Sequence, residues 1–268
     1  MASQKFRKYY VRGSTLPFEE DKTHEFKGHL NLCQEEIPPW AQETKRERGS
    51  RKPISRNLNA FLNSGLGGTV FLGVIDSGKI FGINMTKLTR DHFLKSVDNL
   101  MRRYDPQVLP HQYSVRFTPV VDAKSTQEAI VQLLEHISSE ELTDADKERK
   151  HIFRTSNYCW CHKDATARYN SGVTSTDFVL EVIIKPWDDH DPRNPSLGED
   201  ERVRIQPYYN NEEGKVFFRK QASVVQYTIC DLVRMTRDEV QKKYDEEMDR
   251  LKQRYEELLR KKALVDGS

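Results

Sequence analysis

The sequence predicts an α+β fold, a mixed β-sheet flanked by helices, followed by a C-terminal helix with coiled-coil character. Apolar runs bounded by turn residues, such as residues 69–75 after a glycine pair, are typical of strands covered on both faces. Between these runs lie segments whose apolar residues recur at helical spacing. The 268 residues are enough for one large domain or two small ones.

The N-terminal half should form a strand, a helix and a hairpin. Residues 24–27 read as a short strand, and Ile54–Ser64 carries apolar residues at helical spacing. Residues 69–75 are expected as a buried strand, with a turn at residues 76–78 that returns the chain along residues 79–83.

The rest of the chain alternates between predicted helices and strands. A helix should start near Thr89, which is a candidate N-cap, and Pro106 lies beyond its end. The remaining predicted elements are strands at residues 113–121, 177–184, 203–208 and 215–220, and helices at residues 126–137 and from residue 228.

We assign residues 1–235 to one domain with insertions at residues 28–53 and 122–176, and residues 236–268 to a helical tail. Apolar residues in the tail recur at alternating steps of four and three, which indicates a short coiled coil. A single helix packed on its own domain is the alternative. The seam residues are Tyr244, Met248, Leu251, Tyr255 and Leu258.

The composition describes a soluble and charge-rich protein, with 36% hydrophobic and 31% charged residues. Because the net charge is only +2, any surface that binds nucleic acid must be local. No apolar run is long enough to cross a bilayer, and the basic start lacks the apolar stretch of a secretory signal. Four cysteines without a disulfide framework fit a reducing, cytoplasmic compartment.

Three carboxylates are candidates for a common site. Glu20 and Glu25 stand five residues apart before a Phe-Lys pair, and Asp76 follows the predicted buried strand. Carboxylates a few Å apart raise one another's pKa, and a divalent cation relieves this repulsion. Oxygen-only ligand sets favour Mg²⁺ or Mn²⁺. The alternative is that Glu20 and Asp76 are ordinary cap or turn residues.

Five ordered motifs carry a resemblance to a known family. Glu20-x4-Glu25-Phe-Lys27, the stretch from Asn59 to Gly68 (Asn-Ala-Phe-Leu-Asn-Ser-Gly-Leu-Gly-Gly) and the stretch from Phe71 to Asp76 (Phe-Leu-Gly-Val-Ile-Asp) are the first three. Segments 106–120 and 214–223 are the other two. Together they resemble the Schlafen nuclease core, an AlbA_2-type lobe, and with the helical tail they look most similar to the Schlafen-like protein 1 group.

The resemblance implies a metal-dependent endoribonuclease that needs no ATP and acts on structured RNA such as tRNA or small-RNA precursors. It assigns Glu20, Glu25 and Asp76 as the catalytic triad that holds Mg²⁺ or Mn²⁺. Schlafen cores have two lobes around the RNA, and this chain supplies one. A homodimer, or a heterodimer with another Schlafen-like chain, is therefore implied.

Basic residues are the candidates for RNA contact. Some lie in the first insertion, where the run of residues 45–52 carries five basic residues against one acid, and others lie beside the family motifs. A solvated loop is the alternative for the insertion. The candidates are Lys27, Arg46, Arg48, Arg51, Lys52, Arg219 and Lys220.

Two other functions stay open. The chain could be a non-catalytic nucleic-acid-binding or scaffold subunit of a Schlafen-like complex, or a transcriptional regulator. Convergence of the three carboxylates within metal-bridging reach distinguishes the nuclease from both.

Zinc is a separate question. Cys159, Cys161 and His162 offer thiolates and an imidazole that could bind zinc, although a second pair at the usual spacing is missing. The structural zinc of the Schlafen family is not expected here. Residues 111–113 read His-Gln-Tyr in place of His-x-Cys, and no Cys-Cys pair stands near residues 178–179.

Overall fold

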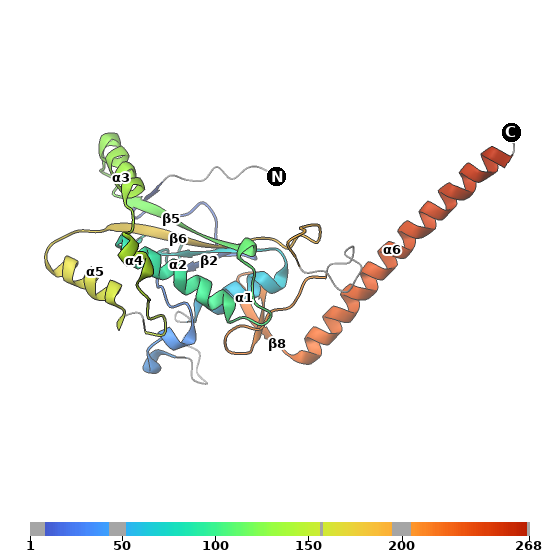
Figure 1. The fold of residues 1–268 in the computed structure, drawn as a ribbon, viewed down its shortest axis with the longest axis horizontal. Helices are drawn as coiled ribbons and strands as arrows, with labels where there is room; N and C mark the ends of the chain where they lie inside the picture. The colour runs from blue at the N-terminus through green and yellow to red at the C-terminus, as the bar shows by residue number, and fades with distance from the viewer. Residues whose placement is uncertain (1–8, 43–51, 156–157, 195–204, 267–268) are drawn as a thin grey trace. The chain divides into compact units, whose positions relative to one another are not determined.

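The computed structural model describes residues 9–42, 52–155, 158–194 and 205–266. The chain divides into two units, residues 1–195 with 206–226 and residues 196–205 with 227–268. The first unit holds a mixed sheet with helices, and the second is mainly the helix α6 (Ile229–Asp266) (Figure 1). This confirms the predicted α+β class. No helix of the described residues is both long and apolar enough to cross a bilayer.

The main sheet has six strands in the order β1-β5-β6-β3-β2, and β4 also pairs with β6. Strand β6 is antiparallel to β3, β4 and β5, whereas β2 runs parallel to β3 and β1 parallel to β5. A second sheet pairs β7 with β8. The bounds are β1 Tyr10–Val11, β2 His24–Lys27, β3 Gly68–Leu72, β4 Ile83–Met85, β5 Tyr113–Val121, β6 Thr176–Ile184, β7 Val216–Lys220 and β8 Ser223–Tyr227.

Helices α1, α2 and α3 lie close to where apolar spacing placed them, whereas α4 and α5 were not predicted from the sequence. The predicted helix Ile54–Ser64 is confirmed as α1, which ends at Gly65 in the left-handed conformation. The bounds are α1 Ile54–Ser64, α2 Lys87–Arg102, α3 Gln127–Ser139, α4 Asp144–Glu148 and α5 Trp160–Asn170, with 3-10 turns at Gln34–Glu36, Pro39–Ala41 and Pro110–Gln112.

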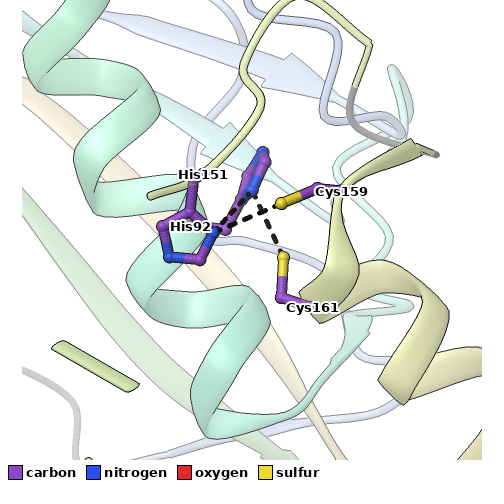
Figure 2. Close-up of side chains that lie close together, drawn as sticks. All are labelled: His92, His151, Cys159 and Cys161. Atoms are coloured by element: carbon purple, nitrogen blue, oxygen red, sulfur yellow. Dashed lines mark hydrogen bonds between the residues drawn. The ribbon is translucent and has the colours of Figure 1, made fainter. Parts of the chain in front are cut away.

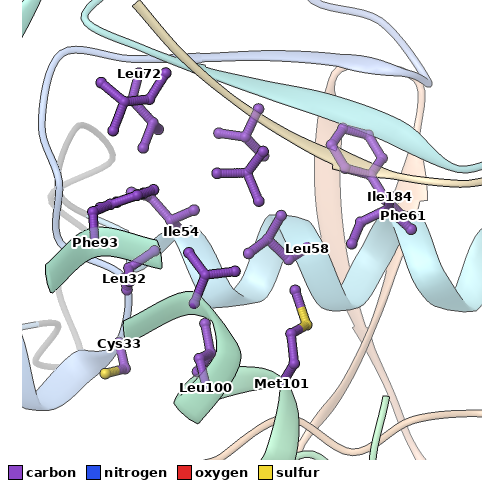
Figure 3. Close-up of a cluster of buried hydrophobic side chains, with 14 of the residues drawn as sticks. Leu32, Cys33, Ile54, Leu58, Phe61, Leu72, Phe93, Leu100, Met101 and Ile184 are labelled. Carbon is purple, nitrogen blue, oxygen red and sulfur yellow. The ribbon is translucent and has the colours of Figure 1, made fainter. Parts of the chain in front are cut away.

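The larger hydrophobic cluster lies between the sheet and helices α1 and α2 (Figure 3). Leu58 and Phe61 of α1 are fully buried and share the cluster with Leu100 of α2 and Ile184 of β6. Each such side chain removed from water contributes about 1.5–3 kcal/mol. A smaller cluster, which includes Phe26 and Phe71, packs the N-terminal segment against the sheet. These two clusters hold β2 and β3, the strands that position the candidate acids.

Two buried asparagines of α1 attach the segment that leads into β7. The Asn59 amide donates to the Tyr209 carbonyl (2.8 Å) and accepts from the Phe217 amide (2.8 Å). Asn63 accepts from the Tyr209 amide (2.7 Å) and donates to the Phe217 carbonyl (3.0 Å). These side chains satisfy backbone groups that would otherwise be buried without partners.

Helix α2 starts earlier than expected. It begins at Lys87, and the Thr86 hydroxyl caps it by accepting from the Thr89 amide (3.3 Å). Thr89, the expected N-cap, instead occupies the third helical position and accepts from the Thr86 amide (2.9 Å). The reason is that two threonines three residues apart form a reciprocal capping box, which favours the earlier start.

The predicted hairpin after β3 forms only as a turn. Strand β3 ends at Leu72, and a single bridge between Val74 and Ile80 joins the two arms. Both edges of β3 already pair, with β2 and with β6, so a third strand cannot add to it. The expected strand at residues 203–208 is absent from its described part, residues 205–208; residues 203–204 lie outside the described residues.

Gly67 provides a test of the close approach between the connection from α1 to β3 and the end of β6. It has φ +68°, and a Cβ there would lie 2.6 Å from the Ile184 carbonyl oxygen and from the Pro186 nitrogen. Gly67→Ala should destabilise the fold by about 1–3 kcal/mol more than the backbone penalty alone.

The matched control is Gly13→Ala. Gly13 has φ +77°, but a Cβ there would meet only the end of Lys79 at 3.8 Å. Gly13→Ala should therefore lower the free energy of unfolding only by the cost of a left-handed alanine, about 1–2 kcal/mol. Urea unfolding measures both variants, and equal losses would contradict the packing argument.

Candidate active site

The three candidate acids lie around one edge of the sheet. Glu25 is on β2, Glu20 precedes β2, and Asp76 lies in the turn after β3. Because β2 runs parallel to β3, with Glu25 opposite Val70, the carboxyl ends of both strands point to this edge. Glu20 and Asp76 line the same open hollow, together with Phe26.

Glu20 interacts electrostatically with the other two acids. It is half-buried, and its Oε1 accepts a hydrogen bond from the Phe26 amide (2.8 Å). Burial raises the Glu20 pKa, and the nearby charges of Glu25 and Asp76 raise it further, whereas the Phe26 amide and Lys27 lower it. The net shift is upward, so a cation at this hollow would be favoured.

Glu25 is buried between two cations. The Lys27 Nζ lies 2.5 Å from its Oε1, and the Arg219 Nη1 lies 2.5 Å from its Oε2. The Arg219 side chain is only 1% exposed and also donates to the carbonyls of Asp21 and His24 (both 2.9 Å). The contact with Arg219 is an ion pair without an aligned N–H, and Oε2 accepts no hydrogen bond from the described residues.

The ligand atoms of the three acids are of the type that a hard divalent cation prefers. They offer oxygen ligands alone, Glu25 Oε2 is buried without a hydrogen bond, and Asp76 is exposed toward the hollow. Their spacing is wider than a bound ion requires. Among the described residues, the groups whose ligand atoms all lie within 4.8 Å of one another do not include these acids. Lys27 and Arg219 supply the positive charge beside Glu25 instead.

The basic residues that were expected to contact RNA lie in different environments. Lys27 and Arg219 form ion pairs with Glu25, and their contact with RNA stays a prediction. Lys220 is exposed at the end of β7, and Lys52 is half-buried. The three remaining candidates, Arg46, Arg48 and Arg51, lie outside the described residues.

A second cluster combines histidines and cysteines. The ligand atoms of His92, His151, Cys159 and Cys161 all lie within 4.8 Å of one another (Figure 2). Two of these residues, Cys159 and Cys161, were zinc candidates from the sequence, whereas His92 and His151 were not. His162, the third sequence candidate, has its Nδ1 3.3 Å from Cys161 Sγ but lies outside the group.

Burial controls protonation in this cluster. Burial, together with the nearby His162 and His151, lowers the pKa of His92 to about 3, so this imidazole is neutral at neutral pH. Burial also raises the pKa of the Cys161 thiol to about 12. A neutral imidazole can bind a metal directly, whereas a thiol binds as the thiolate and releases its proton to solvent when the metal binds.

The positions where Schlafen proteins would carry their zinc have other partners here. The His111 Nε2 and the Asn194 Oδ1 are 2.9 Å apart. The Tyr113 hydroxyl donates to Asp98 (2.5 Å). The cluster of histidines and cysteines is built on other residues of the chain.

A comparison with protein-family models identifies a family domain over most of the chain. The model described as Schlafen, AlbA_2 matches residues 20–228. The matched range contains all three candidate acids, the sheet from β2 onward and the insertions, and it ends just before α6. It covers well over half of the 268 residues.

The raised pKa of Glu20 predicts how a neutral substitution affects stability. Because the pKa of Glu20 is higher in the folded than in the unfolded state, the folded state loses stability as the pH rises from the unfolded-state pKa through the folded-state pKa. Glu20→Gln removes this penalty and should unfold at a higher temperature than wild type at pH 7 in EDTA. The gain should vanish as the pH falls below the ordinary glutamate pKa.

The neighbouring exposed acid provides the control, because Glu19→Gln changes the same charge without the burial of Glu20. Thermal melts of the three proteins across this pH range test the idea. A Glu20→Gln protein less stable than wild type at pH 7 in EDTA would show that the folded state does not disfavour the charged form of Glu20.

Proposed function

Because this chain belongs to the Schlafen AlbA_2 family, we propose that it is a metal-dependent endoribonuclease, or the nuclease subunit of a complex, that acts on structured RNA such as tRNA or small-RNA precursors. Family membership supports a nuclease-like or nucleic-acid-binding function. The observation that carries the finer proposal is that Glu20 and Asp76 line one open hollow, and that the charges of Glu25 and Asp76 both act on Glu20.

The proposed roles follow from the positions of the acids. Glu20, Glu25 and Asp76 would hold Mg²⁺ or Mn²⁺, which when bound lowers the pKa of an attacking water and offsets charge on the scissile phosphate. Lys27 and Arg219 orient the Glu25 carboxylate from two sides. Asp76 is exposed in its turn, so a bulky polynucleotide can approach it without a rearrangement of the fold.

One observation favours a second candidate function, a non-catalytic nucleic-acid-binding subunit. The Glu25 oxygens already face Lys27 and Arg219, and the three acids do not converge as tightly as a bound ion requires. In this function the ion pairs of Glu25 would stabilise β2 against β7. RNA would then bind without being cleaved.

Asp76→Asn tests the first proposal. The side chain is exposed, so the change should leave the fold intact, and it removes a proposed metal ligand. Even outer-shell changes lower metal affinity about 10–100-fold. We therefore expect cleavage of a tRNA pool with Mn²⁺ to fall by more than about 100-fold. RNA affinity should stay the same or rise, because a carboxylate that repels phosphate is lost.

Cleavage is read on a denaturing gel beside an EDTA control, and affinity by filter binding. Glu25→Ala should behave in the same way, and Glu19→Gln is the control that changes an exposed acid outside the triad. Cleavage by Asp76→Asn at the wild-type rate would reject the triad. Binding without cleavage by wild type would favour the second function.

The basic residues of the first insertion give a complementary test of binding. Replacing Arg46, Arg48, Arg51 and Lys52 with Ala removes positive charges that would neutralise phosphates. This variant should bind RNA more weakly and with a flatter dependence on salt. Its cleavage rate at saturating RNA should stay close to that of wild type.

We also propose that the nuclease groove is completed by a second lobe, from another copy of this chain or from a Schlafen-like partner. Helix α6 has 38 residues and exposes apolar side chains along its length, including Tyr244, Leu251, Tyr255 and Leu258. Exposed apolar residues at heptad spacing are a typical surface for pairing between helices. Three heptads pair only weakly, so contacts between the folded lobes are also expected.

Replacing Leu251 and Leu258 with Asp would place charges in this seam and should weaken dimerisation by more than about 100-fold, with cleavage falling in parallel. Gln253→Asp with Ala263→Asp makes the same charge change outside the seam. Light scattering at several concentrations measures the assembly. Wild type that is monomeric at micromolar concentration and still cleaves RNA would refute the composite groove.

A further inference from the structure

We propose that His92, His151, Cys159 and Cys161 bind one structural Zn²⁺ that fastens the insertion at residues 122–176 to helix α2. His92 lies on α2, His151 lies between α4 and α5, and the two cysteines stand at the start of α5. Figure 2 shows the four side chains converging on one point from these three segments. This inference does not depend on the proposed nuclease function.

The distances match the edges of a tetrahedral zinc site. His92 Nδ1 lies 3.3 Å from His151 Nδ1 and 3.3 Å from Cys161 Sγ. His151 Nδ1 lies 3.4 Å from Cys159 Sγ. For Zn–N of about 2.0–2.1 Å and Zn–S of about 2.3 Å, a tetrahedron has N–N edges of about 3.3 Å and N–S edges of about 3.5 Å. Three edges therefore agree with a bound ion.

The ligand set points to zinc rather than to another metal. Two thiolates with two imidazoles in tetrahedral geometry suit Zn²⁺, whereas Mg²⁺ and Ca²⁺ require oxygen ligands. All four side chains are buried, and together they would close the coordination shell. A closed shell without room for a water is the mark of a structural site.

Groups around the cluster orient the ligands. The His151 Nε2 and the Asp91 Oδ2 are 2.8 Å apart, and Lys95 holds the same carboxylate oxygen at 2.8 Å. When His151 Nε2–H donates to the Asp91 carboxylate, the lone pair of His151 Nδ1 faces the cluster, which is the carboxylate–histidine–zinc arrangement. The Ile152 amide also donates to Cys159 Sγ (3.4 Å), as backbone amides do toward metal thiolates.

The insertion needs such a fastening because it buries little apolar surface. Among its described residues, the buried hydrophobic ones are Ile130, Cys159 and Cys161. Apart from the cluster, it is attached to α2 mainly by Leu142 packed near Leu88 and by polar contacts such as those made by Glu140 and Glu141. Zinc binding adds its free energy to the stability of a segment like this one.

Metal analysis of the full chain tests the proposal. After dialysis against buffer without free zinc, wild type should retain close to one zinc per chain by mass spectrometry of the metal. Cys159→Ser with Cys161→Ser should retain almost none. Cys33→Ser with Cys230→Ser changes the two cysteines outside the cluster and should retain wild-type zinc. Wild type without zinc after growth in zinc-supplemented medium would overturn the proposal.

Histidine variants separate the structural ligand set from its neighbours. His92→Asn and His151→Asn should lose zinc, whereas His162→Asn should keep it, because His162 lies outside the group. Asp91→Asn should weaken zinc binding about 10–100-fold in competition with a coloured chelator. Equal zinc loss in His162→Asn and His92→Asn would overturn this ligand set.

Two measurements on wild type remain decisive if the ligand variants do not fold. Cobalt exchanged for zinc should give the intense visible absorption of a tetrahedral site together with a thiolate charge-transfer band. Zinc added back to stripped protein should slow hydrogen exchange in α5 and leave β5 and β6 unchanged. Stripped protein with wild-type exchange in α5, and without a cobalt spectrum, would show a metal-free cluster of thiols and imidazoles.

Discussion

The pairing of strand β3 on both of its edges is the constraint on which the site depends. Parallel β2 lies on one edge and antiparallel β6 on the other, in register from Gly68 with Ile184 to Leu72 with Leu180. Because β3 is saturated, the chain beyond Leu72 leaves the sheet as a turn. That turn carries Asp76 to the hollow that Glu20 also lines, on the side of the sheet where β2 holds Glu25.

Elements with strong local signals could be predicted from the sequence. Helix α1 matches its predicted bounds because apolar spacing defines its buried face and Gly65 ends it. Strand β5 likewise matches its alternating pattern at Tyr113–Val121. The pairing of β3 could not be predicted in this way, since a turn signal after a strand does not reveal that both edges of the strand are already occupied.

The site could be predicted only where residues are close in sequence or share a motif. Glu20 and Glu25 belong to one short motif, but the burial of Arg219 against Glu25 depends on β7 reaching β2 from almost two hundred residues away. His92 and His151 are separated in sequence by 59 residues and lack a common spacing with the cysteines. Only the packing of the insertion on α2 places them together, so composition and spacing could not predict this group.

The asparagines of α1 change how a motif match should be understood. The side-chain amides of Asn59 and Asn63 form the hydrogen bonds that a neighbouring strand would otherwise provide to the backbone at Tyr209 and Phe217. Aspartate or leucine at either position would leave buried backbone groups without a hydrogen-bond partner. The requirements of folding alone therefore explain why the stretch from Asn59 to Gly68 has this sequence. A protein that had lost its chemistry would keep this signature for as long as it kept its shape. The motif therefore identifies the scaffold, and it carries no information about the acids at the sheet edge.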